Sequence, residues 1–124
     1  GIMLSIAIGI AESNGLKKVF IANHGGDHTI YPDCRNEFIK AMDQAAQAGT
    51  FVNVSIEAPY THITKGDIAK IGKELNIDFA ETWSCYKGEE LHCGVCGTCI
   101  ERKEALQEAG IKDTTIYSEN SSSK

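Results

Sequence analysis

The sequence predicts an α/β fold, a doubly wound parallel sheet that ends in a module with four clustered cysteines. Apolar segments with helical spacing alternate with short β-rich segments, and four of the five cysteines lie between residues 85 and 99. Helices that alternate with strands favour parallel strands joined by right-handed crossovers over a helical bundle or a sandwich. Ligands bind at the carboxyl ends of strands in such sheets, so we expect functional loops to begin at Asn23, Pro59 and Ser84.

The first part of the chain predicts a helix and a buried strand. Residues 2–13 are apolar on nearly every face and are followed by Gly15, which predicts a helix buried on more than one side. Residues 19–22 form a short apolar segment of strand-favouring side chains, as in a buried parallel strand. The chain starts without a methionine and directly inside this apolar helix, which favours the C-terminal part of a longer protein.

A loop, a second helix and a second strand follow. Residues 23–32 are polar, and Asp33 is suited to cap a helix over residues 34–48. Residues 51–58 alternate apolar and polar side chains, which predicts a strand with one wetter face that ends at Pro59.

The next segment predicts a helix that starts with a capping box at Thr64. Its apolar face is expected to hold Ile68, Ile71 and Leu75. A further strand is expected over residues 79–83, directly before the cysteines.

The last helix is expected over residues 98–109, and a polar tail follows it. The predicted organisation is an α/β domain over residues 1–83, a zinc module with its helix over residues 84–110, and a tail over residues 111–124.

Composition argues against nucleic-acid and membrane partners. The chain has 124 residues, of which 42% are hydrophobic and 23% are charged, as in a compact globular domain. Lys and Arg total 12 and Asp and Glu total 17, so the net charge is -5, and the basic residues form no run that would contact phosphates. The apolar stretch at residues 2–10 is too short to span a membrane and lacks the flanks of a signal peptide. We therefore expect a cytoplasmic protein.

The clustered cysteines follow the pattern C-x7-C-x2-C-x2-C, in which two tight turns and one longer loop can complete a tetrahedron of soft ligands. The four residues are Cys85, Cys93, Cys96 and Cys99. Four thiolates leave no open coordination position, so we expect structural Zn2+ that supports folding. The alternatives are a [4Fe–4S] cluster, redox thiols or unligated thiols.

Neighbours of the cysteines carry further expectations. Gly94 and Gly97 each follow a cysteine, where such turns often require a positive φ. His92 could replace a cysteine as a ligand, but beside Cys93 it is expected to be solvated instead. Trp83 is expected to belong to the core or to cover the zinc module.

Three segments together are more specific than the cysteine spacing. They are YPDCRNEF at residues 31–38, EAPYTHITKGDI at residues 57–68 and ETWSCY at residues 81–86. With the cysteines that follow, they resemble the 7-cyano-7-deazaguanine synthase family, also called QueC, over residues 1–110.

The resemblance implies an adenine nucleotide alpha-hydrolase-like (Rossmann-like) fold and an ATP-dependent carbon–nitrogen ligase of the PP-loop superfamily. Such an enzyme would convert 7-carboxy-7-deazaguanine and ammonia into 7-cyano-7-deazaguanine (preQ0) for queuosine biosynthesis, a tRNA modification pathway. ATP with Mg2+ would activate the carboxylate as an adenylate, and ammonia would displace AMP to give the amide. A second ATP would drive dehydration to the nitrile.

The family's phosphate-binding Ser-Gly-Gly-x-Asp-Ser loop does not occur in this sequence. The adjacent glycines Gly25 and Gly26 lack the trailing serine and a following apolar helix. The resemblance therefore implies the C-terminal part of the enzyme, which we expect to be inactive alone. The alternative is a non-catalytic zinc-stabilised module for binding or dimerisation, and a homodimer is compatible with both. A tRNA-thiolating relative fits less well, because it would need the same loop and a basic face.

Candidate substrate-binding side chains lie mainly on the loop after the first predicted strand. They are Asp27, Tyr31, Asp33, Arg35 and, at the start of a later helix, Lys65. Arg35 could bind a carboxylate or phosphate bidentately, or pair with Glu37. Asp33 could accept hydrogen bonds from a guanine-like amino group besides capping a helix, and Tyr31 could stack on a flat base or pack in the core.

Three other positions leave alternatives open. A cation at a helix N-terminus is unfavourable, so Lys65 is expected to have an anionic partner or to be solvated. His24, Asp27 and His28 could hold magnesium or zinc, contact the substrate, or belong to a solvated loop. Cys34 is expected to be a small buried side chain rather than a nucleophile.

Overall fold

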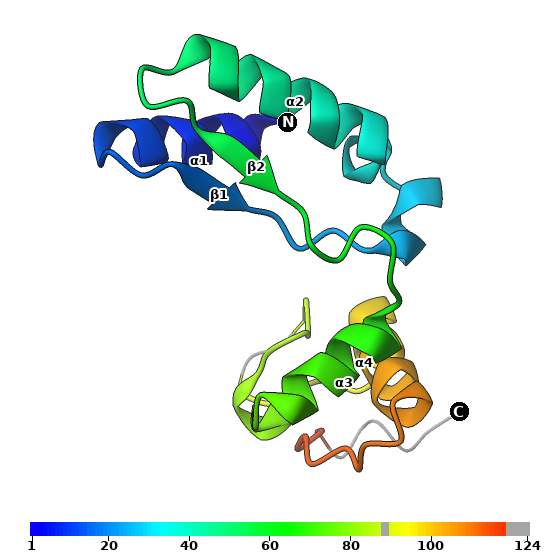
Figure 1. The fold of residues 1–124 in the computed structure, drawn as a ribbon. Coiled ribbons are helices and arrows are strands. Elements are labelled where there is room, and N and C mark those ends of the chain that lie inside the picture. Colours follow the sequence, from blue (N-terminus) through cyan, green and yellow to red (C-terminus); the bar gives the residue numbers. More distant parts are fainter. Residues whose placement is uncertain (88–89, 119–124) are drawn as a thin grey trace. The chain divides into compact units, whose positions relative to one another are not determined.

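The computed structural model describes residues 1–87 and 90–118 (Figure 1). Its contacts divide the chain into two compact units, Gly1–Thr64 and Lys65–Lys124. The end of the predicted tail, from residue 119 on, lies outside the described residues. The domain boundaries predicted between residues 83 and 84 and between residues 110 and 111 stay a prediction.

The first unit places two helices against a two-stranded parallel sheet (Figure 1). Its elements are α1 (Ile2–Ser13), β1 (Lys18–Phe20), α2 (Asn36–Gly49) and β2 (Ser55–Glu57). Val19 lies opposite Ile56 in the parallel register. Leu4 from α1, Ile39 from α2 and Ile56 form the centre of the buried core. The parallel pairing confirms the predicted α/β class.

Both strands are shorter than predicted. The residues before β2 form a turn, in which Asn53 has a φ of 53° and the backbone N–H of Val54 donates to Thr50 Oγ1 at 2.8 Å. An extended strand cannot continue through this left-handed residue, so the ladder is limited to the residues after it.

Helix α1 is apolar all round but buried on one side only. Its buried residues are Leu4 and Ala11. Ile2 and Met3 are 80% and 78% exposed, and Ile10 is 58% exposed. The predicted burial on more than one side is therefore wrong for the chain as it stands, because the small sheet covers a single face of the helix.

The segment between β1 and α2 forms two short 3-10 helices, η1 (Gly25–Thr29) and η2 (Pro32–Cys34). The predicted N-cap role of Asp33 is wrong, because Arg35 occupies the N-cap position of α2 and Asp33 lies inside η2. The backbone N–H of Arg35 donates to Pro32 O at 3.2 Å, and this tight turn delays the start of the helix.

The second unit packs helix α3 against helix α4 (Figure 1). Its elements are α3 (Lys65–Glu74), η3 (Phe79–Glu81) and α4 (Gly97–Glu108). The helix predicted over residues 98–109 is confirmed within one residue at each end. The strand predicted over residues 79–83 is wrong, because Asp78 accepts a hydrogen bond from the backbone N–H of Ala80 at 2.9 Å and starts a 3-10 turn there.

Helix α3 buries its small residues rather than the predicted apolar face. The buried positions are Gly66, Ala69 and Gly72, whereas Leu75 is 67% exposed. A Cβ atom on Gly72 would lie only 3.0 Å from Phe79 Cζ. The close approach of neighbouring segments therefore selects small side chains on this face.

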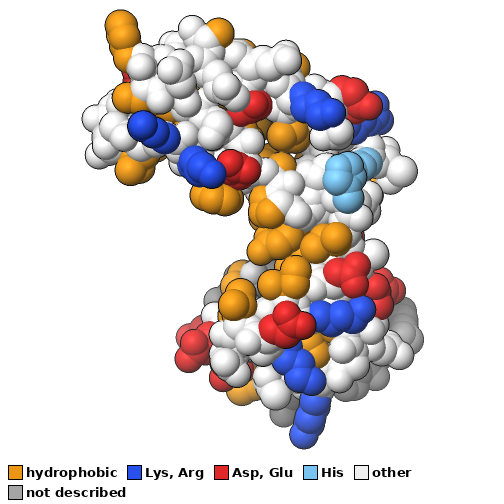
Figure 2. All heavy atoms as spheres, in the orientation of Figure 1, with side chains coloured by type: hydrophobic (Ala, Val, Ile, Leu, Met, Phe, Trp, Pro, Cys, Tyr) orange, Lys and Arg blue, Asp and Glu red, His pale blue; other side chains and the backbone are white. Residues whose placement is uncertain are grey.

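Charged side chains of both signs are interspersed on the face shown in Figure 2. Within residues 1–87 and 90–118, no helix combines the length and the apolar character needed to cross a membrane.

Candidate metal centre

The four cysteine sulfurs converge in the second unit. Cys85 follows η3, Cys93 and Cys96 precede α4, and Cys99 lies in its first turn. The four sulfur atoms lie within 4.8 Å of one another, and those of Cys85 and Cys96 are 3.9 Å apart. Tetrahedral coordination with metal–sulfur bonds of about 2.3 Å requires sulfurs about 3.8 Å apart. The donor set and its spacing therefore fit one metal ion.

Backbone N–H groups support the sulfur atoms. The N–H of Cys93 donates to Cys85 Sγ at 3.3 Å, and the N–H of Cys96 donates to Cys93 Sγ at 3.4 Å. Gly94 has a φ of 72°, as predicted for this turn. The same prediction is wrong for Gly97, which is the first residue of α4 and has no positive φ.

The thiols differ in acidity. The Thr98 hydroxyl, 3.2 Å from Cys96 Sγ, and nearby backbone N–H groups lower the pKa of Cys96 to about 5. Burial raises the pKa of Cys99 to about 12, and this residue has no exposed surface. A buried thiol ionises readily only beside a cation. A metal ion at the centre of the cluster would supply the charge that Cys99 needs.

Trp83 and His92 cover one side of the cysteine module. His92 is 4% exposed, and its Nε2 atom accepts a hydrogen bond from the backbone N–H of Ser84 at 3.1 Å. The ring of Trp83 lies 4.2 Å from that of His92, and its Nε1–H donates to Cys85 O at 2.8 Å. The prediction that His92 is solvated is wrong, because this ring covers it. Trp83 occupies the covering position that was one of its two predicted roles.

Arg102 is a buried residue of this unit that the sequence pattern did not single out. It is 9% exposed and its guanidinium donates to Thr115 Oγ1 at 2.8 Å, to Ser84 Oγ at 3.1 Å and to Phe79 O. One cation thus holds together the segment before Cys85, the helix α4 and the chain after it. Its position three residues after Cys99 on the same helix was the available signal.

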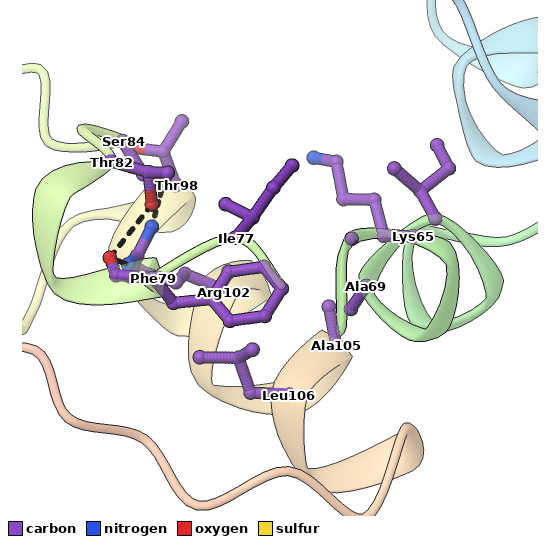
Figure 3. Close-up of a pocket in the computed structure, with 12 residues that line it drawn as sticks. Lys65, Ala69, Ile77, Phe79, Thr82, Ser84, Thr98, Arg102, Ala105 and Leu106 are labelled. Carbon is purple, nitrogen blue, oxygen red and sulfur yellow. Dashed lines mark hydrogen bonds between the residues drawn. The ribbon is translucent and has the colours of Figure 1, made fainter. Parts of the chain in front are cut away.

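A cavity of about 400 Å³ lies between α3 and α4 (Figure 3). Its lining includes the apolar side chains of Ile68, Ile77 and Phe79, which would suit a flat apolar group. Lys65 also lines it and forms an ion pair with Glu101, so the anionic partner expected for this lysine is a carboxylate of α4. Contact of Lys65 with a substrate stays a prediction.

In the first unit, the loops at the carboxyl ends of β1 and β2 meet. Asn23 Nδ2 donates to Thr61 Oγ1 at 3.3 Å, and the backbone N–H of Gly25 donates to Ile63 O at 2.9 Å. This is the edge of a parallel sheet at which ligands bind.

The candidate substrate residues Asp27, Tyr31 and Arg35 lie on this edge. Asp27 accepts a hydrogen bond from the backbone N–H of His24 at 3.2 Å, and the N–H of Tyr31 donates to Asp27 O at 2.8 Å. Arg35 Nε donates to His28 O at 2.9 Å. The three residues therefore share one ordered loop, and their contact with a substrate stays a prediction.

The remaining candidates of the first unit are Asp33, Cys34 and the group of His24, Asp27 and His28. Asp33 Oδ2 lies 3.0 Å from the nitrogen of Gly1. Burial raises the pKa of the Cys34 thiol, which disfavours a nucleophilic role. His24, Asp27 and His28 do not converge as metal ligands, because the cysteine cluster is the only such group of three or more within the part of the chain that the structure describes.

The structure defines a class of protein, an α/β protein with parallel strands that carries a four-cysteine cluster able to hold a metal ion. The family model described as "Queuosine biosynthesis protein QueC" matches residues 1–110. The chain therefore belongs to the QueC family, as the sequence motifs indicated.

Proteins named 7-cyano-7-deazaguanine synthase are similar to nearly the whole chain. A relative from Porphyromonas gingivalis is 66% identical over 117 residues, which are 94% of this chain and 53% of the relative. A relative from Desulfotalea psychrophila is 53% identical over 117 residues, which are 94% of this chain and 53% of the relative. One from Caldicellulosiruptor bescii is 47% identical over 116 residues, 94% of this chain and 52% of the relative. The chain thus spans about half the length of these curated relatives.

Proposed function

We propose that this chain is part of a 7-cyano-7-deazaguanine synthase. The enzyme would be an ATP-dependent ligase that makes 7-cyano-7-deazaguanine from 7-carboxy-7-deazaguanine and ammonia. The observation that carries this proposal is the 66% identity to a synthase of that name across 94% of the chain. In the proposed reaction, ammonia displaces AMP from an acyl-adenylate to give an amide, and a second ATP drives loss of the amide oxygen.

The residues of this chain do not fit the phosphates of ATP. The Gly25-Gly26 pair opens only η1, a 3-10 helix of five residues, and no Ser-Gly-Gly-x-Asp-Ser loop occurs in the sequence. The residues that bind ATP and Mg2+ would come from the part of the enzyme that the relatives have in addition. We infer that this chain alone is inactive.

The four cysteines would hold structural Zn2+. A four-thiolate site leaves no coordination position for a substrate, so the ion would crosslink the segment at Cys85 to the start of α4. Its role would be to stabilise the second unit rather than to take part in the chemistry.

Arg35 would bind the carboxylate of the substrate. Its Nε–H is used by His28 O, and its terminal nitrogens have no hydrogen-bond partner among the described residues, so they can form the paired bonds that a carboxylate accepts. Tyr31, which is 53% exposed, could stack on the flat ring system. Asp27 and Asp33 would accept hydrogen bonds from its amino group. Lys65 belongs to the second unit and would need to leave Glu101 to bind an anion there.

The test is turnover by the zinc-loaded protein encoded by the complete gene. With ATP, ammonia and 7-carboxy-7-deazaguanine, mass spectrometry should find the nitrile. Arg35→Ala should lower kcat/KM by about 10- to 100-fold, the value of a hydrogen-bonded charge, whereas Lys40→Ala, on the exposed side of α2, should leave it unchanged. Absence of the nitrile would refute the synthase and favour the non-catalytic zinc-stabilised module. Unchanged turnover of Arg35→Ala would remove Arg35 from the site.

A further inference from the structure

Lys103 connects helix α4 to the turn that carries two of the cysteines. It lies four residues after Cys99, so both side chains share one face of α4. Its Nζ donates to Gly94 O at 2.9 Å. Gly94 is the left-handed residue between Cys93 and Cys96. One helix face therefore provides a sulfur of the cluster and a cation that binds the neighbouring turn.

An aromatic ring fixes the lysine from its other side. The Nζ atom of Lys103 lies 4.3 Å from the centroid of the Tyr117 ring, a distance typical of a cation–π contact. The Tyr117 hydroxyl donates to Asp113 Oδ2 at 2.6 Å, which holds the ring in place. Lys103 is half-buried between the ring and the carbonyl. The position of the ammonium group is thus set from two sides.

A divalent ion with four thiolates carries a net negative charge. A cation held near the sulfurs and partly shielded from water offsets such a charge, since partly buried charges are screened less by salt than exposed ones. Arg102, a buried cation of the same unit, donates to Phe79, Ser84 and Thr115 instead. Among residues 1–87 and 90–118, Lys103 is the cation that donates a hydrogen bond to the cysteine turn itself.

We propose that Lys103 is a positioning residue of the metal centre: its ammonium group holds the Gly94 turn and offsets the charge of the thiolates, and both effects slow loss of the metal. The inference rests on the structural Zn2+ proposed above. Outer groups that orient metal ligands typically change metal affinity by about 10- to 100-fold when mutated. Lys103 would not touch the ion; it would slow the loss of the ion through the Gly94 turn and the charge of the neighbouring sulfurs.

The test measures how fast an excess of a chelating dye removes zinc from the protein encoded by the complete gene. Lys103→Met keeps the aliphatic stem against Tyr117 and removes the charge, and it should release zinc about 10-fold faster than the wild type. Lys103→Arg, which keeps charge and donor, should stay close to the wild type. The difference between Lys103→Met and the wild type should narrow only at high salt of about 1 M, where the screening length falls to about 3 Å and reaches a half-buried charge.

The controls separate this role from folding and from the metal assignment. Lys112→Met removes an exposed lysine of the same unit and should leave release unchanged. If Lys103→Met folds poorly by circular dichroism, Lys103→Gln replaces it as the neutral variant. Two results would overturn the role of Lys103 and leave the metal assignment standing. One is a zinc-release rate of the neutral variant within twofold of the wild-type rate. The other is a release rate of Lys103→Arg as fast as that of the neutral variant. A wild-type protein purified without zinc would overturn the metal assignment as well, whereas loss of nitrile formation in a zinc-loaded protein would leave this inference standing.

Discussion

Replacing Arg102 by Met should destabilise the second unit by about 2–4 kcal/mol. The guanidinium makes three hydrogen bonds, two of them at 2.8 and 3.1 Å to Thr115 and Ser84, and a third to Phe79 O. Bonds from a charged donor contribute about 1.5–3 kcal/mol each, and an acceptor left unpaired in the interior costs about 1–3 kcal/mol. Three such bonds would sum to about 4.5–9 kcal/mol, but the three acceptors lie on half-buried residues and can bind water in the variant. Removal of the charge also ends the cost of burying it. We therefore expect a net loss well below that sum, at about 2–4 kcal/mol.

Urea unfolding followed by circular dichroism measures this change, with both proteins fully loaded with metal. The matched control is Lys112→Met, the same chemical change at an exposed position of the same unit, which should shift the unfolding free energy by less than about 0.5 kcal/mol. An Arg102→Met variant as stable as this control would show that the three hydrogen bonds contribute no net stability, and the reasoning from burial would be refuted.

The remaining predictions concern the backbone, pH and the metal. Gly94→Ala should destabilise the second unit by about 1–2 kcal/mol, because Gly94 has a φ of 72°. Gly97→Ala should be neutral or stabilising, because Gly97 lies in a helix and no atom lies within 4 Å of a new Cβ there. Equal urea unfolding midpoints for the two variants would contradict this prediction. Burial raises the pKa of Tyr117 to about 12, so the folded state favours the neutral phenol. The contribution of this raised pKa to the free energy of unfolding is fully present below the ordinary pKa of about 10. It should be lost as the pH rises from there towards 12. Tyr117→Phe should lack this loss, and parallel pH profiles of the two proteins would refute the assignment. Removing the metal with a chelator should lower the melting temperature of the second unit, and an unchanged melting curve would argue against a structural ion.

The cysteine cluster could be predicted because its information is local. Two C-x2-C turns bring their sulfurs together whatever the rest of the chain does, and Gly94 has the positive φ that such a turn requires. The helices α1 and α4 were predictable for a similar reason, since long runs of helix formers bounded by Gly15 and Gly110 leave few alternatives.

The burial of single side chains depends on contacts between distant segments, and it was not predictable. His92 is buried because Trp83, nine residues earlier, stacks on it. Arg102 is buried because acceptors from the segment before Cys85 and from the chain after α4 surround it. The apolar pattern at residues 79–83 suggests a strand, but the Asp78 side chain starts a 3-10 turn that the pattern does not encode. Tertiary packing decided each of these cases.

Zinc-edge X-ray absorption on the freshly purified protein tests the central claim most directly, since it reports the identity of the metal and its ligands together. We predict one Zn2+ per chain with four sulfur ligands at about 2.3 Å, from Cys85, Cys93, Cys96 and Cys99. Iron with visible absorption, nitrogen or oxygen atoms in the coordination shell, or protein without bound metal would contradict it.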